Sequence, residues 1–426
     1  MNGNIFIKKA SQLITVSGVS PKQGKAMGDI GVIENGAVLV TNGKIAAVGK
    51  SAQLEREVEE EKTETIDAEG KIVLPGFVDS HTHLIFAGSR VDEFLLRSQG
   101  ASYMDIMRSG GGIQRTVNET RKASKNLLEE GARKWLDRML EFGVTTIEAK
   151  SGYGLDRDTE IKQLEVIQSL DHCHPVDIAS TFLGAHAVPS DYKERPGAYL
   201  DFLSREVMPE ILERGLSEFC DIFCEKGVFS IQESRAFLER AKKMGFQLKM
   251  HADELFPMGG AELAASLGAL SADHLLMASD KGILSLAEKG VIATLLPGTA
   301  FCLKEPYARA RHMIDRGCAV ALSTDLNPGS SATISIPFIM AIAVMQMGMT
   351  IEETITAFTL NGAAALQRSH LIGSIDPGKW GDLVVIDYPS YGAIPYHAGM
   401  NGVEITIKKG EVVWRKASKV CCQISR

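Results

Sequence analysis

The sequence lacks the features of a secreted, disulfide-stabilised protein and of a membrane protein. Its cysteines are few and show no paired spacing; they stand at positions 173, 220, 224, 302, 318, 421 and 422. A disulfide framework is therefore not expected, and reduced thiols are. The first dozen residues lack the charged-then-apolar order of a signal peptide, and no apolar run reaches the ~18 residues of a membrane span. These absences predict a soluble, cytoplasmic protein that has no membrane partner.

An excess of positive charge is also missing. The chain has 46 Lys and Arg against 53 Asp and Glu, which gives a formal net charge of −7. No basic run suggests a nucleic-acid footprint, so we expect no nucleic-acid partner. Because the chain as a whole repels anions, an anionic small-molecule substrate would need basic residues placed locally in its pocket.

Length and composition are those of a globular protein with a large core. Hydrophobic residues make up 45% and charged residues 23% of the chain, which is close to the average for soluble proteins. The 426 residues exceed one ordinary domain, although an α/β barrel of about 250 residues or more forms a single unit.

Secondary-structure signals divide the chain into three parts. Residues 1–75 predict short strands, with a hairpin at Asn42-Gly43. From about residue 76, amphipathic helical segments alternate with apolar strands, as in 124–143 followed by VTTIEA, which predicts parallel β/α architecture. After about residue 374 the helices are expected to stop. We therefore predict an α/β fold with a (β/α)8 TIM-type barrel over 76–373 and a small β-sandwich domain formed from both chain termini, 1–75 plus 374–426.

The strongest local signal is PGFVDSHTHLIF at 75–86, where an apolar strand ends in His81-Thr82-His83. Residues i and i+2 of a strand point to the same side, so both imidazoles can reach one ion. Two ordinary histidines could show the same spacing. The position at the C-terminal end of the first barrel strand is what favours a metal site.

Other ionisable residues stand where further barrel strands are predicted to end. His251 and Glu254 lie in QLKMHADE, and Asp325 lies in AVALSTDLNPGSS. His186 and His274 end two more strands. A closed barrel brings the C-terminal ends of its strands to one face, so we expect these side chains to lie near His81 and His83.

Three imidazoles, one carboxylate and a water molecule suit a borderline first-row metal ion. The strand-end histidines 81, 83, 186, 251 and 274 and the Asp325 carboxylate are the candidate ligands, and we expect zinc, with iron or manganese as alternatives. No cysteine accompanies these residues, which favours a catalytic over a structural ion. Such an ion would lower the pKa of its bound water to about 7 and polarise a carbonyl, so we expect a metal-dependent hydrolase.

Motifs along nearly the whole chain carry a family resemblance. They are FAGSR (86–90), GGGI (110–113), EAKSGYGL (148–155), GAHAVP (184–189), HADE (251–254), SADH (271–274), LLPGT (295–299) and STDLNPGSS (323–331). With PGFVDSHTH they resemble the amidohydrolase superfamily of metal-dependent barrels. More closely, the chain resembles the cyclic amide hydrolases that open the imidazolone ring of 4-imidazolone-5-propanoate to N-formimidoyl-L-glutamate in histidine degradation.

The resemblance implies roles for particular residues. It implies one ion held by His81, His83, His251 and Asp325, with metal-bound hydroxide attacking the ring carbonyl. It implies that His274 lies beside the metal-bound water, and it implies substrate contacts from Arg90, Tyr153, His186, Glu254, Asn327, Gly329 and Ser330. The catalytic proton carriers would be His274, Glu254 and Asp325, and the choice of principal base among them stays open.

Two basic residues can be interpreted from their chemistry. Arg90, on the first β-to-α loop, is a planar bidentate donor that suits a substrate carboxylate, with Tyr153 assisting. Many superfamily members bind two ions bridged by a carboxylated lysine, for which Lys150 is the candidate here. Because the resemblance implies a single ion, we interpret Lys150 as a structural or electrostatic support.

Alternative hypotheses are open at this point. The chain could be a deaminase of the same superfamily, acting on guanine or cytosine, or a non-catalytic barrel that serves as a binding protein. A homodimer is expected by family analogy alone. The glycines at 110–112 lack the Lys-Ser/Thr of a phosphate-binding loop and are expected to form a flexible loop over the site.

Overall fold

The computed structural model describes residues 4–56, 58, 63–100 and 111–417, and two eight-stranded sheets organise this part of the chain. The strands of the first sheet are buried, and each one pairs with its neighbour in parallel. In chain order they are β6 (Phe77–Asp79), β7 (Val144–Lys150), β8 (Asp177–Ala185), β9 (Phe219–Cys224), β10 (Gln247–Ala252), β11 (Ser271–His274), β12 (Ile292–Leu295) and β13 (Val320–Leu322).

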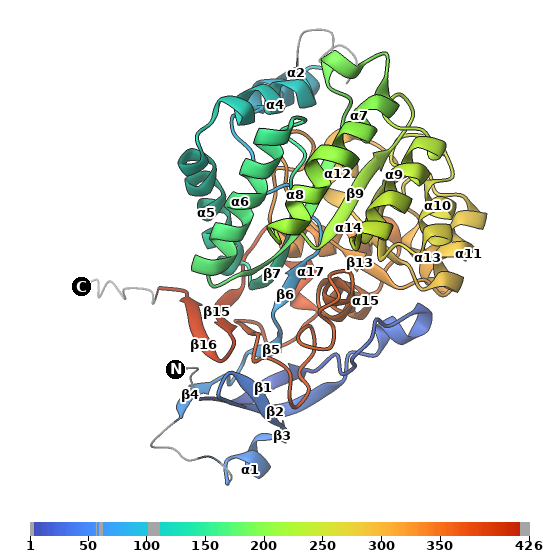
Figure 1. The fold of residues 1–426 in the computed structure, drawn as a ribbon. Coiled ribbons are helices and arrows are strands. Elements are labelled where there is room, and N and C mark those ends of the chain that lie inside the picture. Colours follow the sequence, from blue (N-terminus) through green and yellow to red (C-terminus); the bar gives the residue numbers. More distant parts are fainter. Residues whose placement is uncertain (1–3, 57, 59–62, 101–110, 418–426) are drawn as a thin grey trace.

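Helices return the chain between these strands and cover the outside of the sheet (Figure 1). Capping side chains and left-handed glycines mark the ends of several of these helices. For example, Ser230 and Glu233 form a capping box at the start of α9, and Gly245 ends it with a φ of 111°. Among the described residues, the α-helices between Val91 and Ala364 are α2 (Val91–Ser98), α4 (Ile113–Lys122), α5 (Lys125–Glu141), α6 (Arg157–Cys173), α7 (Pro196–Phe202), α8 (Met208–Glu213), α9 (Ile231–Met244), α10 (Gly260–Leu267), α11 (Asp280–Lys289), α12 (Pro297–Leu303), α13 (Ala310–Asp315), α14 (Ile336–Met347), α15 (Ile351–Phe358) and α16 (Leu360–Ala364).

The first and last barrel strands meet just beyond their C-terminal ends. Thr82 and Leu326 form a parallel bridge, and the His83 amide donates to the Leu326 carbonyl at 2.9 Å. At the end of β6, the buried Asp79 carboxylate accepts hydrogen bonds from the Ser323 and Thr324 hydroxyls. These contacts close the sheet into a barrel, which confirms the predicted fold class.

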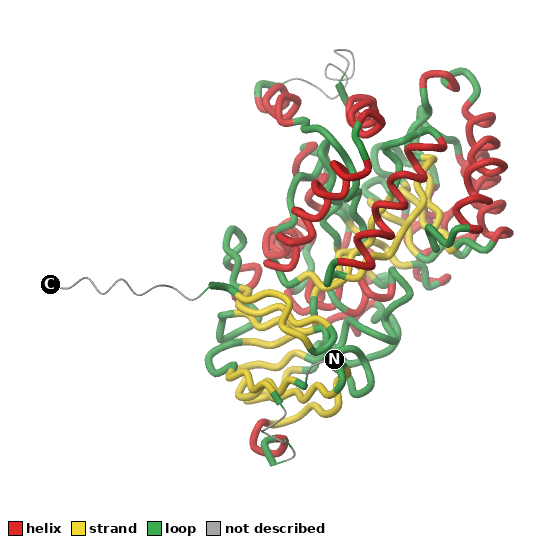
Figure 2. Tube along the Cα trace, turned by 60° about the vertical axis from the view of Figure 1, so that its left-hand side comes forward, coloured by secondary structure: helices red, strands yellow, loops and turns green. Residues whose placement is uncertain are grey.

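The second sheet is built from both ends of the chain, as expected for the smaller domain. Its antiparallel β5–β14 pair joins the two ends, with Val73 opposite Val385. Figures 1 and 2 show this sheet beside the barrel, with N-terminal and C-terminal strands side by side. Its strands are β1 (Ile5–Ile14), β2 (Val32–Thr41), β3 (Lys44–Lys50), β4 (Glu64–Asp67), β5 (Ile72–Pro75), β14 (Leu383–Ile386), β15 (Val403–Lys408) and β16 (Glu411–Arg415).

The region after residue 374 differs in one respect from the sequence expectation. A short helix, α17 (Ala393–Tyr396), follows β14, although the helices were expected to stop there. Its Ile394 is buried and packs into the large core, so tertiary contacts stabilise a segment too short to signal itself by periodicity. The boundaries 1–75 plus 374–426 and 76–373 stay a prediction, and residues 418–426 lie outside the described part.

The described cysteines, at 173, 220, 224, 302 and 318, are free thiols, in agreement with the absence of a disulfide pattern. None of the helices in the described ranges has both the length and the apolar character needed to cross a membrane.

Candidate metal centre

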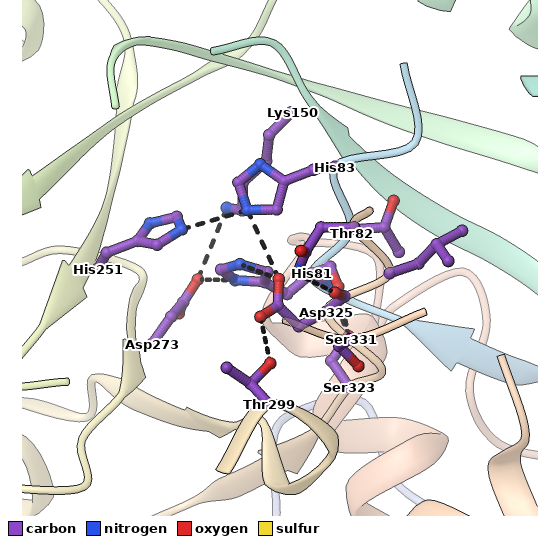
Figure 3. A network of polar contacts seen from close by, with 12 residues as sticks. His81, Thr82, His83, Lys150, His251, Asp273, Thr299, Ser323, Asp325 and Ser331 are labelled. Atoms are coloured by element: carbon purple, nitrogen blue, oxygen red, sulfur yellow. Dashed lines mark hydrogen bonds and ion pairs between the residues drawn. The ribbon is translucent and has the colours of Figure 1, made fainter. Parts of the chain in front are cut away.

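The segment that follows β6 presents two imidazoles to the barrel mouth. It is fixed at His81, whose amide donates to the Ser323 hydroxyl at 2.7 Å and whose carbonyl accepts from the Asp325 amide at 3.1 Å. His81 and His83 are both buried, and their ring centroids lie 5.4 Å apart. Figure 3 shows them turned toward His251 and Asp325, as the i, i+2 spacing predicted.

The three expected imidazole ligands have ring nitrogens within 4.8 Å of one another, and the Asp325 carboxylate lies beside two of them. The Asp325 Oδ1 atom lies 3.5 Å from His81 Nε2 and 3.6 Å from His83 Nε2, and His251 Nε2 lies 3.4 Å from His83 Nε2. Nitrogen and oxygen ligands about 2.0–2.1 Å from a tetrahedral ion are separated by about 3.4 Å, so the spacing fits one first-row ion.

Two of the expected ligand atoms lack hydrogen-bond partners, which also indicates a metal site. His81 Nε2 and Asp325 Oδ1 are buried and have no hydrogen-bond partner among the described residues. A buried polar atom without a partner is costly. A cation bound between these atoms would satisfy both, so the residues present fit a metal ion.

Two carboxylates that were not predicted from the sequence contact the Nδ1 atoms of His81 and His251, on the ring side away from the expected ion. Asp273 Oδ2 lies 2.7 Å from His81 Nδ1, and Asp221 Oδ2 lies 2.9 Å from His251 Nδ1. A carboxylate on Nδ1 turns Nε2 toward the ion and raises the basicity of the imidazole. The available signal was a charged residue inside an apolar strand, in FCDIFC and SADH, but the histidine partners lie far away in sequence.

The electrostatics favour the neutral imidazole that a metal requires at two of the three expected histidine ligands. Burial lowers the pKa of His81 and of His83 well below the usual histidine value. For His251, burial acts in the same direction, but the Asp221 carboxylate outweighs it and the pKa is raised. Burial raises the pKa of Asp325 to about 7, although the Thr299 hydroxyl, which donates a hydrogen bond to Asp325 Oδ2, acts to lower it. A bound cation would favour neutral imidazoles and an ionised Asp325.

Lys150 lies beneath the centre as an ion-paired ammonium. Its Nζ is 2.9 Å from Glu148, 2.8 Å from Asp221 and 3.6 Å from Asp273, and all four side chains are fully buried. Burial alone would lower the pKa of Lys150, but the three carboxylates together raise it. A charged ammonium cannot be a metal ligand, so this environment supports the interpretation of Lys150 as an electrostatic support.

Two of the proposed proton carriers lie together beside the ligands. His274 Nδ1 is 3.6 Å from Glu254 Oε1, and the His274 and His251 ring centroids are 5.1 Å apart. Burial raises the pKa of Glu254 to about 8 and lowers that of His274 well below its usual value. The neighbouring Asp253 accepts backbone hydrogen bonds from residues 258–261, which fixes the loop that carries Glu254.

Tyr153 and His186 form an aromatic wall next to His83. The His186 ring stacks on His83 at 4.7 Å between centroids, and the Tyr153 ring lies 5.7 Å from His83. The Tyr153 loop is held by Glu160, another residue missed from sequence, which accepts from the amides of Gly152, Gly154 and Leu155. Burial raises the pKa of Tyr153 and lowers that of His186 to about 3, so both side chains are neutral near pH 7.

The turn after Asp325 meets the first β-to-α loop. The Asn327 Oδ1 atom accepts from the amides of Gly329 and Ser330 at 2.8 and 2.7 Å, and Asn327 Nδ2 donates to the Asp325 carbonyl at 2.8 Å. Asn327 thus shapes the turn with the polar atoms that were expected to contact substrate. Arg90 packs against Gly329, where a Cβ atom would come within 2.0 Å of Arg90 Nη1.

The glycine run is described only in part. Gly110 lies outside the described residues, whereas Gly112 has a φ of 80° and precedes α4. The Gly112 amide donates to Glu93 at 3.1 Å. A covering role for 110–113 stays a prediction.

Comparison with known proteins agrees with this architecture. A family model described as the amidohydrolase family matches residues 72–413. An imidazolonepropionase of Clostridium tetani is 56% identical over 415 residues, covering 97% of this chain and 99% of that protein. An imidazolonepropionase of Geobacillus sp. (strain WCH70) is 52% identical over 421 residues, covering 98% and 99%.

Solved structures support the fold at much lower sequence identity. The guanine deaminase of E. coli is 15% identical with a TM-score of 0.71, and the match covers 97% of this chain and 100% of that one. A triazine hydrolase variant is 18% identical with a TM-score of 0.73, covering 97% and 95%. At this identity the likeness concerns the barrel and its accompanying sheet.

Proposed function

The chain belongs to the amidohydrolase family, and from this premise we propose that it is a cyclic amide hydrolase that opens the imidazolone ring of 4-imidazolone-5-propanoate to N-formimidoyl-L-glutamate in histidine degradation. The observation that carries this proposal is the convergence of four ligand atoms at the barrel mouth, in a chain whose close relatives are named imidazolonepropionase over nearly their full length.

The family is metal-dependent, and we assign one zinc ion to His81, His83, His251 and Asp325. A borderline ion suits three imidazole nitrogens and one carboxylate oxygen. When bound, the metal supplies Lewis acidity that activates a water molecule and polarises the ring carbonyl. Lys150 is ion-paired with Glu148 and Asp221 and is therefore not available as a bridging ligand, which supports a single ion.

Proton transfer in the proposed reaction uses three residues of the chain. Attack of water on the ring carbonyl needs a proton acceptor, and both Asp325 and the neutral His274 offer one. Glu254, with a pKa of about 8, carries a proton near pH 7 and can donate it to the ring nitrogen as the C–N bond breaks. His186 and Tyr153 line the ring subsite and keep charge out of it.

Arg90 is assigned to the propionate carboxylate. Its guanidinium is mostly buried against the Gly329 turn, where it is held by Glu93 with Nη2 2.7 Å from that carboxylate. A planar guanidinium pairs well with a carboxylate. The Ser330 hydroxyl and the Gly329 backbone, presented by Asn327, complete this end of the subsite.

The proposal is tested by incubating purified, zinc-replete protein with 4-imidazolone-5-propanoate and following the loss of the imidazolone chromophore and the appearance of N-formimidoyl-L-glutamate. Guanine and cytosine, assayed for ammonia release, are the comparison substrates. Loss of imidazolone without deamination is expected. Survival of the imidazolone while either base is deaminated would replace the proposal by a deaminase, and inertness toward all three would support a binding protein.

Assembly and location are also proposed. We expect a homodimer, by analogy with the family, and a cytoplasmic location, because the described cysteines are free thiols without a disulfide pattern. Sedimentation of the purified protein and fractionation of cells measure these two properties directly.

A further inference from the structure

The helix after Arg90 presents a row of charged residues to the substrate side of the barrel mouth. Arg90, Glu93 and Arg97 follow each other at spacings of three and four along α2, so they share one helix face. That face contacts the Gly329 turn through Arg90 and Arg97. Phe94 and Leu95, on the remaining surface of α2, are 57% and 54% exposed.

The charge of Arg90 is already balanced within the protein. Glu93 Oε2 lies 2.8 Å from Arg90 Nε and 2.7 Å from Arg90 Nη2. The other oxygen of Glu93 accepts from the Gly112 amide at 3.1 Å. A substrate carboxylate that approached this ion pair alone would meet a net neutral unit with a carboxylate in it.

Arg97 supplies the charge that this pair lacks. Its Nη2 donates to the Gly329 carbonyl at 2.7 Å, and its Nε is buried without a hydrogen-bond partner in the described ranges. Among the described residues no carboxylate lies within ion-pairing distance of Arg97, whereas most other arginines of the chain have one. A guanidinium that is partly buried and unpaired is costly unless an anion joins it.

The two guanidinium groups meet at one residue. Arg90 packs where a side chain on residue 329 would stand, and Arg97 holds the carbonyl of the same residue.

We propose that Arg97 is a second carboxylate-binding residue, which joins Arg90 at the Gly329 turn and provides the net positive charge that selects an acid-tailed substrate. This inference rests on the proposed function, because it takes the propionate of the imidazolone as its ligand. With Glu93 and the substrate carboxylate bound, the two arginines and two carboxylates balance to zero.

The test compares Arg97→Met with wild type on 4-imidazolone-5-propanoate and on a neutral analogue in which the carboxylate is replaced by a methyl group. For the acid, KM is expected to rise about 10-fold or more with kcat within about threefold. For the neutral analogue, wild type and variant are expected to differ less than twofold. Arg97→Lys, which keeps the charge, should recover part of the loss.

Arg309→Met is the matched control, because Arg309 also donates to a loop carbonyl, that of Ala278 at 2.8 Å, but away from the Gly329 turn. It should leave KM unchanged for both compounds. An unchanged KM in Arg97→Met, or an equal rise for acid and neutral compounds, would overturn the inference, since the second result means that Arg97 only holds the turn. A wild-type protein that opens neither ring would instead refute the proposed function. Thermal unfolding of each variant identifies any loss of fold. If Arg97→Met is destabilised, the KM of Arg97→Lys is compared with that of Arg97→Gln, which removes the charge but keeps a polar side chain, and only Arg97→Gln is expected to raise KM for the acid about 10-fold.

Discussion

Replacing Asp273 by asparagine isolates the contribution of an orienting carboxylate to metal binding. Asp273 Oδ2 lies 2.7 Å from His81 Nδ1, and both side chains are fully buried. Asparagine keeps the size of the side chain but removes its charge, so the imidazole loses basicity and its fixed orientation. Lys150 keeps its contacts to Asp221 and Glu148 at 2.8 and 2.9 Å, so the variant leaves no ammonium unpaired.

Loss of such a partner typically weakens metal binding about 10- to 100-fold, which corresponds to about 1.4–2.8 kcal/mol. The zinc dissociation constant of Asp273→Asn, measured by competition with a chromophoric chelator at pH 7, should rise by this factor. Asp137→Asn is the matched control, because Asp137 also pairs with a histidine, His174 at 3.3 Å, but is 63% exposed and belongs to the outside of the barrel. An Asp273→Asn protein with wild-type zinc affinity would refute the orienting role.

Three further changes test other parts of the account. Arg90→Ala should raise KM for the imidazolone about 10- to 100-fold with little change in kcat, because a charge-assisted bond of about 1.5–3 kcal/mol is lost; an unchanged KM in steady-state kinetics would remove the carboxylate anchor. Glu254 has a pKa of about 8 and donates its proton only below that pH. A bound cation favours the carboxylate and so lowers this pKa. The value of kcat should therefore fall as the pH rises through about 8 or through a lower value. Glu254→Gln should lower kcat about 100-fold or more and abolish this alkaline limb, and a limb that persists in the pH–rate profile would assign it elsewhere. Lys150→Met leaves three buried carboxylates with one fewer cation and should cost about 3–5 kcal/mol in unfolding free energy by chemical denaturation; a loss below 1 kcal/mol (~fivefold in the unfolding constant) would show that the ion pairs contribute little.

Site residues could be predicted from the sequence where they stand at the C-terminal end of a predicted strand. His81 and His83 could be paired because two residues apart on one strand point the same way, and His251, His274 and Asp325 because each ends a strand of the same barrel. The barrel and the composite sheet followed from the change of periodicity along the chain. The structure brings all of these side chains together.

The supporting residues could not be found this way, because their partners lie on other strands. Asp221 and Asp273 orient histidines that belong to β10 and to the segment after β6, and Glu160 folds the Tyr153 loop through backbone amides. Such contacts depend on the register between neighbouring strands, and the sequence of a single strand does not reveal this register. Arg97 was missed for a related reason, since only the docking of α2 on the Gly329 turn gives it a role.

The account depends most on one metal ion that supports ring opening. Metal-free protein is titrated with zinc, and the initial rate of imidazolone loss is measured against the molar ratio of zinc to chain. The account predicts a rate that rises linearly and breaks at one equivalent, in parallel with zinc retained after gel filtration, and a His251→Ala protein that retains neither zinc nor activity. Full activity without metal, or a rate that rises until two equivalents are bound, would contradict the single-ion centre formed by His81, His83, His251 and Asp325.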